Sequence, residues 1–295
     1  MKLIVTENLA VEIEGDGIAE GVDHRAAQAD GKAEAGVFLQ GLFAAQQPGE
    51  EPQQQGVKDG WDQPDRRGGC DAEDDDLIEK LVTPLTEEAD IAVSYARQIP
   101  REDSGAIEYI SRIFNYPMES RIKSEQDMDE LGIKTYFCSN VCAAYRRDIY
   151  DKLGGFIERA IFNEDMIYAA GAVKAGYRIA YAAAAEIYHS HDYDCGQQFR
   201  RNFDIGVSQA EHPEVFAGIR SEKEGGKYVK ETVYVLKEAR EFGLIPYFYL
   251  QCACRYAGYL LGKHYKRLPK GLILKCTSNK EYWSKSDNGG EVQPD

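Results

Sequence analysis

Residues 165–188 read DMIYAAGAVKAGYRIAYAAAAEIY, and this stretch indicates the fold class. Its first part, Asp165–Ala175, predicts a helix, and Gly176 suits the left-handed conformation that often ends one. Its second part, Arg178–Tyr188, predicts a strand. A helix that leads directly into a strand is typical of a layered α/β domain.

The same alternation extends on both sides of this stretch. We expect strands at Asp90–Ala96 and Lys134–Ala144. The expected helices are Leu77–Leu85, Ser104–Phe114, Arg146–Leu153, Gln197–Ala210, Lys227–Phe242 and Leu244–Leu261. Strands alternating with helices favour an α/β domain over residues 77–222, followed by a helical region over residues 223–295.

The first quarter of the chain has a different composition. Residues 1–76 contain 6 Lys+Arg and 18 Asp+Glu, and all 19 tyrosines come later in the chain. Low hydrophobicity with high net charge buries too little apolar surface to offset the entropy of ordering. We therefore expect residues 1–76 to be an acidic, low-aromatic region, largely disordered or non-native through residue 70. Within it, Lys2–Val5 has the pattern of a strand and Glu34–Ala45 that of a short helix.

Whole-chain composition excludes several classes of protein. The 295 residues are enough for a full core, and the net charge of -15 argues against nucleic-acid binding, which needs a basic face. The seven cysteines have no paired C-x-x-C spacing, so we expect reduced thiols rather than a zinc ribbon or a disulfide framework. No basic-then-apolar leader opens the chain, which predicts a cytoplasmic protein.

The candidate for chemistry is the run FNED at residues 162–165. Glu164 and Asp165 lie where a loop meets a helix N-terminus, whose free N–H groups stabilise carboxylates. The structural alternative is that Asn163 or Glu164 caps the helix and Asp165 only lies in its first turn. The motif taken alone favours the cap.

Six elements in a fixed order strengthen the functional alternative. They are TYFCSNVCAAY at 135–145, Arg146-Arg147, LGGF at 153–156, NEDM at 163–166, GYRI at 176–179 and His189-Ser190-His191. Over roughly residues 77–285, this order and spacing resemble the acceptor-side half of family 2 glycosyltransferases, and most closely the bacterial rhamnosyltransferases. The resemblance implies a GT-A-like fold and transfer of a sugar from a nucleotide donor with inversion at the anomeric carbon.

The resemblance also implies roles for single residues. Asp165 matches the family's general base, which takes the proton of the acceptor hydroxyl, and Glu164 positions the acceptor or the loop. Ser139, Asn140 and Asn163 are expected to bind substrate. The expected partners are a dTDP- or UDP-sugar donor and a saccharide or lipid-linked acceptor of cell-surface polysaccharide assembly.

A divalent cation, Mg²⁺ or Mn²⁺, is a further expectation from the resemblance. His189 and His191 are spaced i and i+2 at the end of the predicted strand, so they lie on one face, where the family places the donor diphosphate. A hard cation also needs a carboxylate, and Asp71 is the candidate. The alternative is a pair of hydrogen-bonded edge histidines, with Asp71 part of a solvated charge run.

Residues 1–70 lack the βαβ succession that opens the family's donor-binding region. We therefore expect a GT-A-like domain that is incomplete at its N-terminus. Two functions stay open: an active inverting transferase, or an inactive fragment or acceptor-binding module without a functional nucleotide-binding half.

The apolar segment Leu244–Leu261 is interrupted only by Gln251 and Arg255 and is followed by basic residues up to Lys270. Eighteen residues that include an Arg make a poor membrane span. The combination fits a helix lying on an anionic leaflet, which predicts peripheral contact of residues 244–270 with the inner face of the plasma membrane. The alternative is a helix packed on the catalytic domain.

Overall fold

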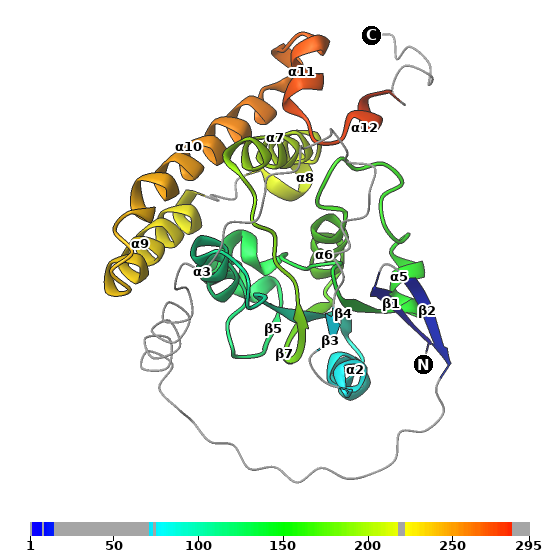
Figure 1. The fold of residues 1–295 in the computed structure, drawn as a ribbon. Helices are drawn as coiled ribbons and strands as arrows, with labels where there is room; N and C mark the ends of the chain where they lie inside the picture. The colour runs from blue at the N-terminus through cyan, green and yellow to red at the C-terminus, as the bar shows by residue number, and fades with distance from the viewer. Residues whose placement is uncertain (1, 8, 15–70, 73–74, 218–221, 285–295) are drawn as a thin grey trace, which may run out of the picture.

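The computed structural model describes residues 2–7, 9–14, 71–72, 75–217 and 222–284 (Figure 1). The helix predicted at Glu34–Ala45 lies outside these residues, as does most of the region predicted to be disordered. The description of the fold therefore concerns the two N-terminal strands and the chain from Asp71 onward.

Seven strands form one mixed sheet in this part of the chain, in the order β2-β1-β6-β4-β7-β3, and β5 also pairs with β7 (Figure 1). Their bounds are β1 Lys2–Glu7, β2 Leu9–Glu14, β3 Asp71–Ala72, β4 Ile91–Ile99, β5 Arg121–Lys123, β6 Ala143–Arg146 and β7 Arg178–Tyr188. Strands β4 and β7 run parallel, and the other neighbouring pairs are antiparallel. The carboxyl ends of β4 and β7 therefore meet at one edge, which is where α/β sheets bind ligands.

Two helices cover opposite faces of the sheet (Figure 1). Helix α2, Leu77–Glu87, packs on the face that carries Ala180 of β7, and α6, Glu164–Lys174, packs on the face that carries Ile179. Successive side chains of a strand point to opposite faces, so both layers use β7. This arrangement confirms the predicted α/β class.

The remaining helices lie around this core and at the C-terminal end of the chain. Their bounds are α3 Ala106–Asn115, α4 Met128–Leu131, α5 Arg147–Lys152, α7 Cys195–Glu211, α8 Pro213–Phe216, α9 Glu222–Glu238, α10 Leu244–Lys263, α11 Lys270–Cys276 and α12 Lys280–Ser284. The helices predicted over 104–114, 146–153, 197–210, 227–242 and 244–261 are thus present, with ends displaced by a few residues.

Helices α7 and α10 approach each other backbone to backbone through three glycines, Gly206, Gly258 and Gly262, which we call the glycine seam. A Cβ added to Gly258 would lie 2.2 Å from the carbonyl oxygen of Phe199, and one added to Gly262 would lie 2.1 Å from that of Phe203. Any larger residue at these positions would therefore push the two helices apart.

The strand predicted at Lys134–Ala144 is mostly wrong. Only Ala143 and Ala144 of that segment belong to a strand, β6, and residues 132–135 form a 3₁₀ turn. Tyr136 and Cys138 are buried in the core although their backbone is irregular. A short apolar run that is buried in a loop cannot be told from a buried strand by its pattern.

The N-terminal hairpin is a second difference. Strands β1 and β2 pair with each other, and β1 also pairs with β6. The strand predicted at Lys2–Val5 is present and continues to Glu7, whereas β2 was not predicted.

Two further observations concern the chain from residue 75 onward. The six cysteines that the structure describes there are free thiols. Among the helices of the described segments, none combines the length and hydropathy needed to cross a membrane.

Candidate active site

Asp165 lies in the first turn of α6, where its carboxylate accepts two backbone hydrogen bonds. Oδ2 accepts from the N–H of Asn140 at 3.1 Å, and Oδ1 accepts from the N–H of Met166 at 2.7 Å. The hydroxyl of Tyr145 in β6 donates to the side-chain carbonyl of Asn140. The structure thus joins two residues predicted for the site, Asp165 and Asn140, and fixes the orientation of the carboxylate.

The surroundings of Asp165 make it a stronger base than an ordinary aspartate. Burial raises the pKa of Asp165 to about 6, the charge of Glu164 acts in the same direction, and the backbone donors oppose both effects. The neighbouring Cys138 and Tyr116 are neutral, because burial raises the pKa of each to about 12, and burial also raises the pKa of Tyr145. A carboxyl group with a pKa near 6 is mostly ionised at neutral pH and still holds a transferred proton.

Asn163 precedes α6 in a left-handed conformation, with φ 65° and ψ 27°, and its side chain makes no capping hydrogen bond. Instead, Nδ2 donates to Oγ of Ser208 in α7 at 3.2 Å, and Ser208 donates to the carbonyl oxygen of Phe162 at 2.6 Å. The buried Asn163 therefore ties the start of α6 to α7. The substrate contact predicted for Asn163 stays a prediction.

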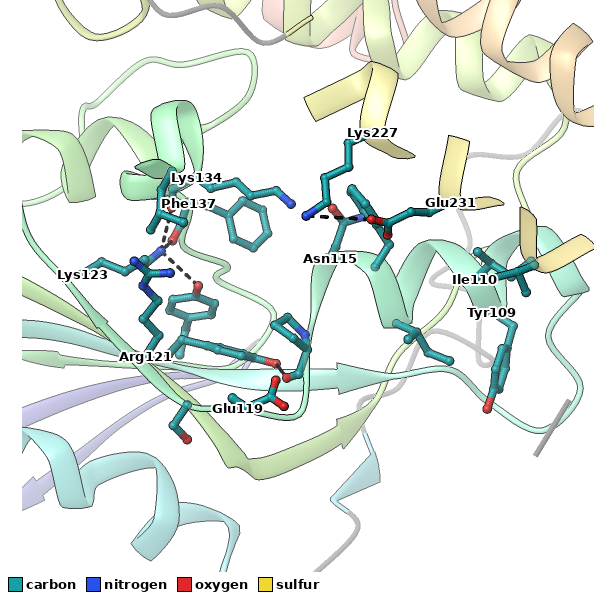
Figure 2. Close-up of a pocket in the computed structure, with 18 residues that line it drawn as sticks. Tyr109, Ile110, Asn115, Glu119, Arg121, Lys123, Lys134, Phe137, Lys227 and Glu231 are labelled. Carbon is teal, nitrogen blue, oxygen red and sulfur yellow. Dashed lines mark hydrogen bonds and ion pairs between the residues drawn. The ribbon is translucent and has the colours of Figure 1, made fainter. Parts of the chain in front are cut away.

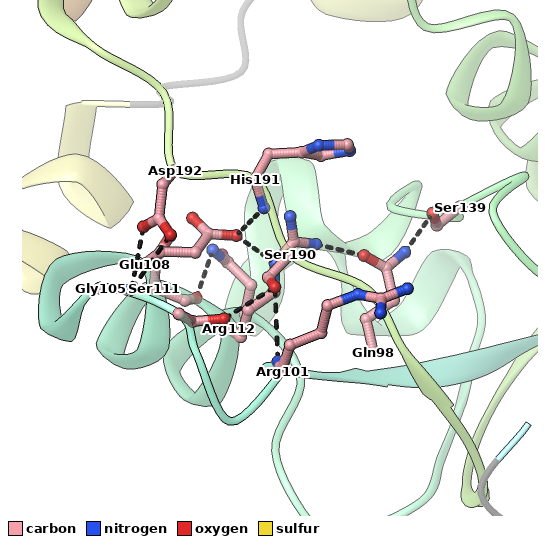
Figure 3. Close-up of polar contacts among 12 residues, drawn as sticks. Gln98, Arg101, Gly105, Glu108, Ser111, Arg112, Ser139, Ser190, His191 and Asp192 are labelled. Carbon is pink, nitrogen blue, oxygen red and sulfur yellow. Dashed lines mark hydrogen bonds and ion pairs between the residues drawn. The ribbon is translucent and has the colours of Figure 1, made fainter. Parts of the chain in front are cut away.

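A chain of polar contacts leads from Ser139 to the histidine segment (Figure 3). Gln98, near the end of β4, donates to Oγ of Ser139 at 2.7 Å and accepts from Arg112 of α3. Arg112 also donates to Glu108 at 2.6 Å, and Glu108 accepts the backbone N–H of His191 at 3.1 Å. The carboxyl ends of β4 and β7 are thus connected through Glu108 and Arg112 of α3.

The histidine pair directly follows the last residue of β7. The rings of His189 and His191 meet edge to face with centroids 4.5 Å apart, so they do lie together as predicted. Burial, and then the charge of Arg112, lower the pKa of His189 to about 3, which keeps its imidazole neutral. The backbone of Asp71 in β3 pairs with Tyr188, which brings this distant residue next to the pair.

These residues fit a divalent cation only in part. The side chains that the structure describes contain no group of three His, Cys, Asp or Glu residues able to hold a metal ion. Arg101, Arg112 and Arg201 all add positive charge at His189, which favours an anionic group over a cation. Hard cations prefer oxygen ligands, so two imidazoles alone do not form such a site. A metal at this position would depend on Asp71.

Sequence reasoning missed Gln98 and Arg112. Gln98 is only 2% exposed, yet both ends of its amide are hydrogen-bonded. The sequence does mark Gln98 as a polar residue near the carboxyl end of an apolar strand. Ligands bind at that end of parallel strands, so this position could have been predicted as part of the site. Arg112 carried no comparable signal, because its pairing with Glu108 one turn earlier is typical of a helix surface and its other partner, Gln98, lies in β4.

A large cavity lies away from Asp165, between β5, α3 and α9 (Figure 2). It measures about 540 Å³ and is lined by aromatic residues that include Tyr95 and Phe137. Lys123 is buried beside them and donates to the hydroxyl of Tyr95 at 3.1 Å and to the carbonyl oxygen of Lys134 at 3.0 Å. Burial lowers the pKa of Lys123 to about 7. None of the residues predicted for the active site lines this cavity.

Comparison with known proteins identifies two relatives. No family model matches the chain, and no solved structure matches it. The chain is 39% identical over 215 residues to the O-antigen chain rhamnosyltransferase WbaN of Salmonella anatum, which covers 72% of this chain and 67% of that protein. It is 39% identical over 214 residues to the O-antigen chain rhamnosyltransferase RfbN of Salmonella typhimurium, with the same coverage. At this identity and coverage, the chain belongs to the family of these O-antigen chain rhamnosyltransferases.

Proposed function

We propose that the chain transfers rhamnose from a nucleotide-sugar donor to a saccharide of a cell-surface polysaccharide, by an inverting reaction in a GT-A-like domain. The two relatives, both O-antigen chain rhamnosyltransferases, support the sugar and the class of acceptor. The observation that carries the type of reaction is the carboxylate of Asp165, which two backbone N–H groups orient and whose pKa burial raises to about 6.

In this reaction Asp165 is the general base. The acceptor oxygen forms a bond to the anomeric carbon while the bond from that carbon to the diphosphate oxygen breaks, and its electron pair leaves with the nucleoside diphosphate. The acceptor proton moves to Asp165, because the surroundings of this carboxylate raise its affinity for a proton. A single displacement of this kind inverts the anomeric carbon. Glu164 orients the acceptor, and Ser139 and Asn140, on the loop opposite Asp165, contact the bound sugars.

The donor, a dTDP- or UDP-sugar, places its diphosphate against the histidine segment. Arg101, Arg112 and Arg201 supply the positive charge there that a diphosphate requires. Asp71, together with His189 or His191, would hold a Mg²⁺ or Mn²⁺ ion at this position. When bound, such an ion offsets charge on the leaving diphosphate.

A non-catalytic acceptor-binding module is the second candidate. The observation that favours it is the hairpin of β1 and β2, which are joined without a helix and pair antiparallel. A βαβ unit would instead join parallel strands through a helix. Before α2, the residues that the structure describes contain no such unit.

Titration calorimetry with dTDP and with UDP, each with and without Mg²⁺ or Mn²⁺, distinguishes the two candidates. Saturable binding of one nucleotide, together with release of that nucleotide from its rhamnose conjugate when acceptor is added, supports the transferase. Absence of binding at millimolar nucleotide and absence of release support the acceptor-binding module. Asp165→Asn is the matched control, because it should bind nucleotide and fail to transfer.

We also propose that α10 rests on an anionic membrane surface. One face of this helix exposes apolar side chains that no other described element covers, and each is between 40% and 58% exposed. They are Tyr249, Leu250, Tyr256 and Leu260. Basic residues follow within 263–270, so the apolar face ends beside positive charge, which complements anionic lipid headgroups. Retention of the protein by vesicles with anionic lipid, but not by neutral vesicles, is the expected result.

A further inference from the structure

A small polar pocket lies between the first turn of α3, the segment that follows His191, the first turn of α7 and one face of α10. Its volume is about 240 Å³. Ligand sites for drug-sized molecules measure roughly 300–1,000 Å³, so this polar pocket suits a smaller molecule. The side chains that matter for the argument are Glu108, Asp192, Asp194, Tyr247, Gln251 and Arg255, which all line it.

Two polar atoms of α10 have no hydrogen-bond partner in the part of the chain that the structure describes. They are Oε1 of Gln251 and Nε of Arg255, and both are buried. Gln251 is only 6% exposed and uses its amide nitrogen to donate to the carbonyl oxygen of Tyr193 at 3.1 Å, so its orientation is fixed. The two residues are one helical turn apart and face the same pocket. Buried polar atoms are nearly always satisfied, so an unpaired acceptor of fixed orientation and an unpaired donor one turn away point to a ligand with hydroxyl groups.

The charge of the polar pocket selects a neutral ligand. Three carboxylates and one guanidinium line it, so an anion such as a nucleotide would meet net repulsion. Both oxygens of Asp192 accept from the backbone N–H of Gly105 at 3.1 Å, and Asp194 accepts from the N–H of Gln197 at 2.7 Å. These bonds fix the carboxylates and leave further acceptor positions free, because each carboxylate has about four lone-pair sites.

Flat aromatic surfaces complete the polar pocket. The rings of His191 and Tyr193 stack at 5.1 Å with an interplanar angle of 22°, and Tyr247 is 42% exposed. Fixed hydrogen-bonding groups beside aromatic rings suit a molecule with a polar edge and an apolar face, and a sugar ring has both.

The polar pocket is also joined to the candidate active site. Glu108 accepts hydrogen bonds from His191 and from Arg112, and Arg112 donates to Gln98, which donates to Ser139 (Figure 3). Ser139 is next to Asn140, whose N–H donates to Asp165. We propose that the polar pocket binds a neutral sugar ring of the acceptor, one that does not carry the reacting hydroxyl. This proposal rests on the proposed transferase function and adds to it a second point of acceptor recognition.

Saturation-transfer NMR with the methyl glycosides of rhamnose, mannose, galactose and glucose tests the proposal without any need for activity. We expect at least one glycoside to receive saturation from the wild-type protein at millimolar concentration, and neither UDP nor dTDP to displace it. Gln251→Met and Arg255→Met should each weaken that binding at least tenfold. Tyr234→Phe, which changes a 64% exposed side chain of α9 that does not line the pocket, should leave it unchanged. Thermal unfolding of each variant shows whether the fold is retained.

Three results would overturn the proposal: no saturation of any glycoside, displacement of the glycoside by nucleotide, or unchanged binding in both α10 variants. Failure of the proposed function gives a different result, because a protein without transferase activity can still bind the glycoside. Asp165→Asn separates the two further, since it should lose transfer and keep glycoside binding.

Discussion

Replacing Asp165 by Asn tests whether this carboxylate is a base or only a structural group. Asn has nearly the same shape but cannot accept the acceptor's proton, so we expect turnover to fall by about 10²–10⁴ while nucleotide affinity is unchanged. The rate of the wild-type enzyme should rise with pH through about 6, where burial places the pKa of Asp165, and then level off. The variant should lack this rise.

The same substitution should change stability in a way that depends on pH. Burial raises the pKa of Asp165 from 3.8 to about 6, which at pH 8 costs the folded state about 3 kcal/mol. Because the folded-state pKa is the higher one, this cost is absent below pH 4 and grows as the pH rises through about 6. The Asp165→Asn variant would avoid the cost but lose one of the two backbone hydrogen bonds, worth about 1 kcal/mol at any pH.

Urea unfolding of both proteins at pH 4 and pH 8 measures the difference directly. We expect the variant to be less stable than wild type by about 1 kcal/mol at pH 4 and more stable by about 2 kcal/mol at pH 8. A purely structural carboxylate predicts the opposite trend, a variant that loses stability relative to wild type as the pH rises. That outcome, or turnover close to that of wild type in an active preparation, would refute the assignment of Asp165 as the base.

Four other substitutions have expected outcomes. In urea titrations, Gly258→Ala should lower the free energy of unfolding by about 1–3 kcal/mol, because its Cβ would overlap the carbonyl oxygen of Phe199. Gly271→Ala is the control: its Cβ would meet nothing within 4 Å, so it should raise the free energy of unfolding by up to about 1 kcal/mol. Leu250→Glu should reduce sedimentation with anionic vesicles several-fold and leave nucleotide binding unchanged; equal sedimentation of both proteins would exclude the α10 face as the contact. Burial lowers the pKa of Lys123 to about 7, so the charged ammonium destabilises the folded state. Above pH 7 the folded state loses this proton more readily than the unfolded state, so wild-type stability should rise between pH 7 and pH 10. Lys123→Met should show a smaller rise, as followed by thermal unfolding across that range.

Prediction of secondary structure from the sequence was most accurate where the local residue pattern agrees with the burial seen in the structure. Strand β7 occupies Arg178–Tyr188 as predicted, because an apolar run bounded by Gly176 and two histidines has few alternatives. The strand predicted at Lys134–Ala144 failed because its apolar residues are buried by contacts with α6 and its neighbours, which no local pattern reveals. The last four residues of strand β2, VEIE, alternate apolar and acidic residues, but the average composition of the region concealed that alternation.

The candidate site was predictable only in part, for a similar reason. Glu164 and Asp165 are adjacent in sequence at a helix start, and the resemblance marked the loop that carries Asn140. The bond from Asn140 to Asp165 spans 25 residues, and the contact between Asn163 and Ser208 spans 45. Such contacts depend on how helices pack on the sheet, and residue spacing does not determine helix packing.

The glycine seam has a mechanical consequence. Where helices meet through side chains, rotamer changes absorb small displacements, but α7 and α10 meet backbone to backbone and have no side chains between them at these positions. Displacement of α10 is therefore passed on to α7, and Ser208 of α7 is bonded to Asn163, two residues before Asp165. A load on the outer face of α10 would reach the start of α6 through this stiff linkage. Amide hydrogens of the two helices should accordingly exchange as one cooperative unit, with the same opening free energy.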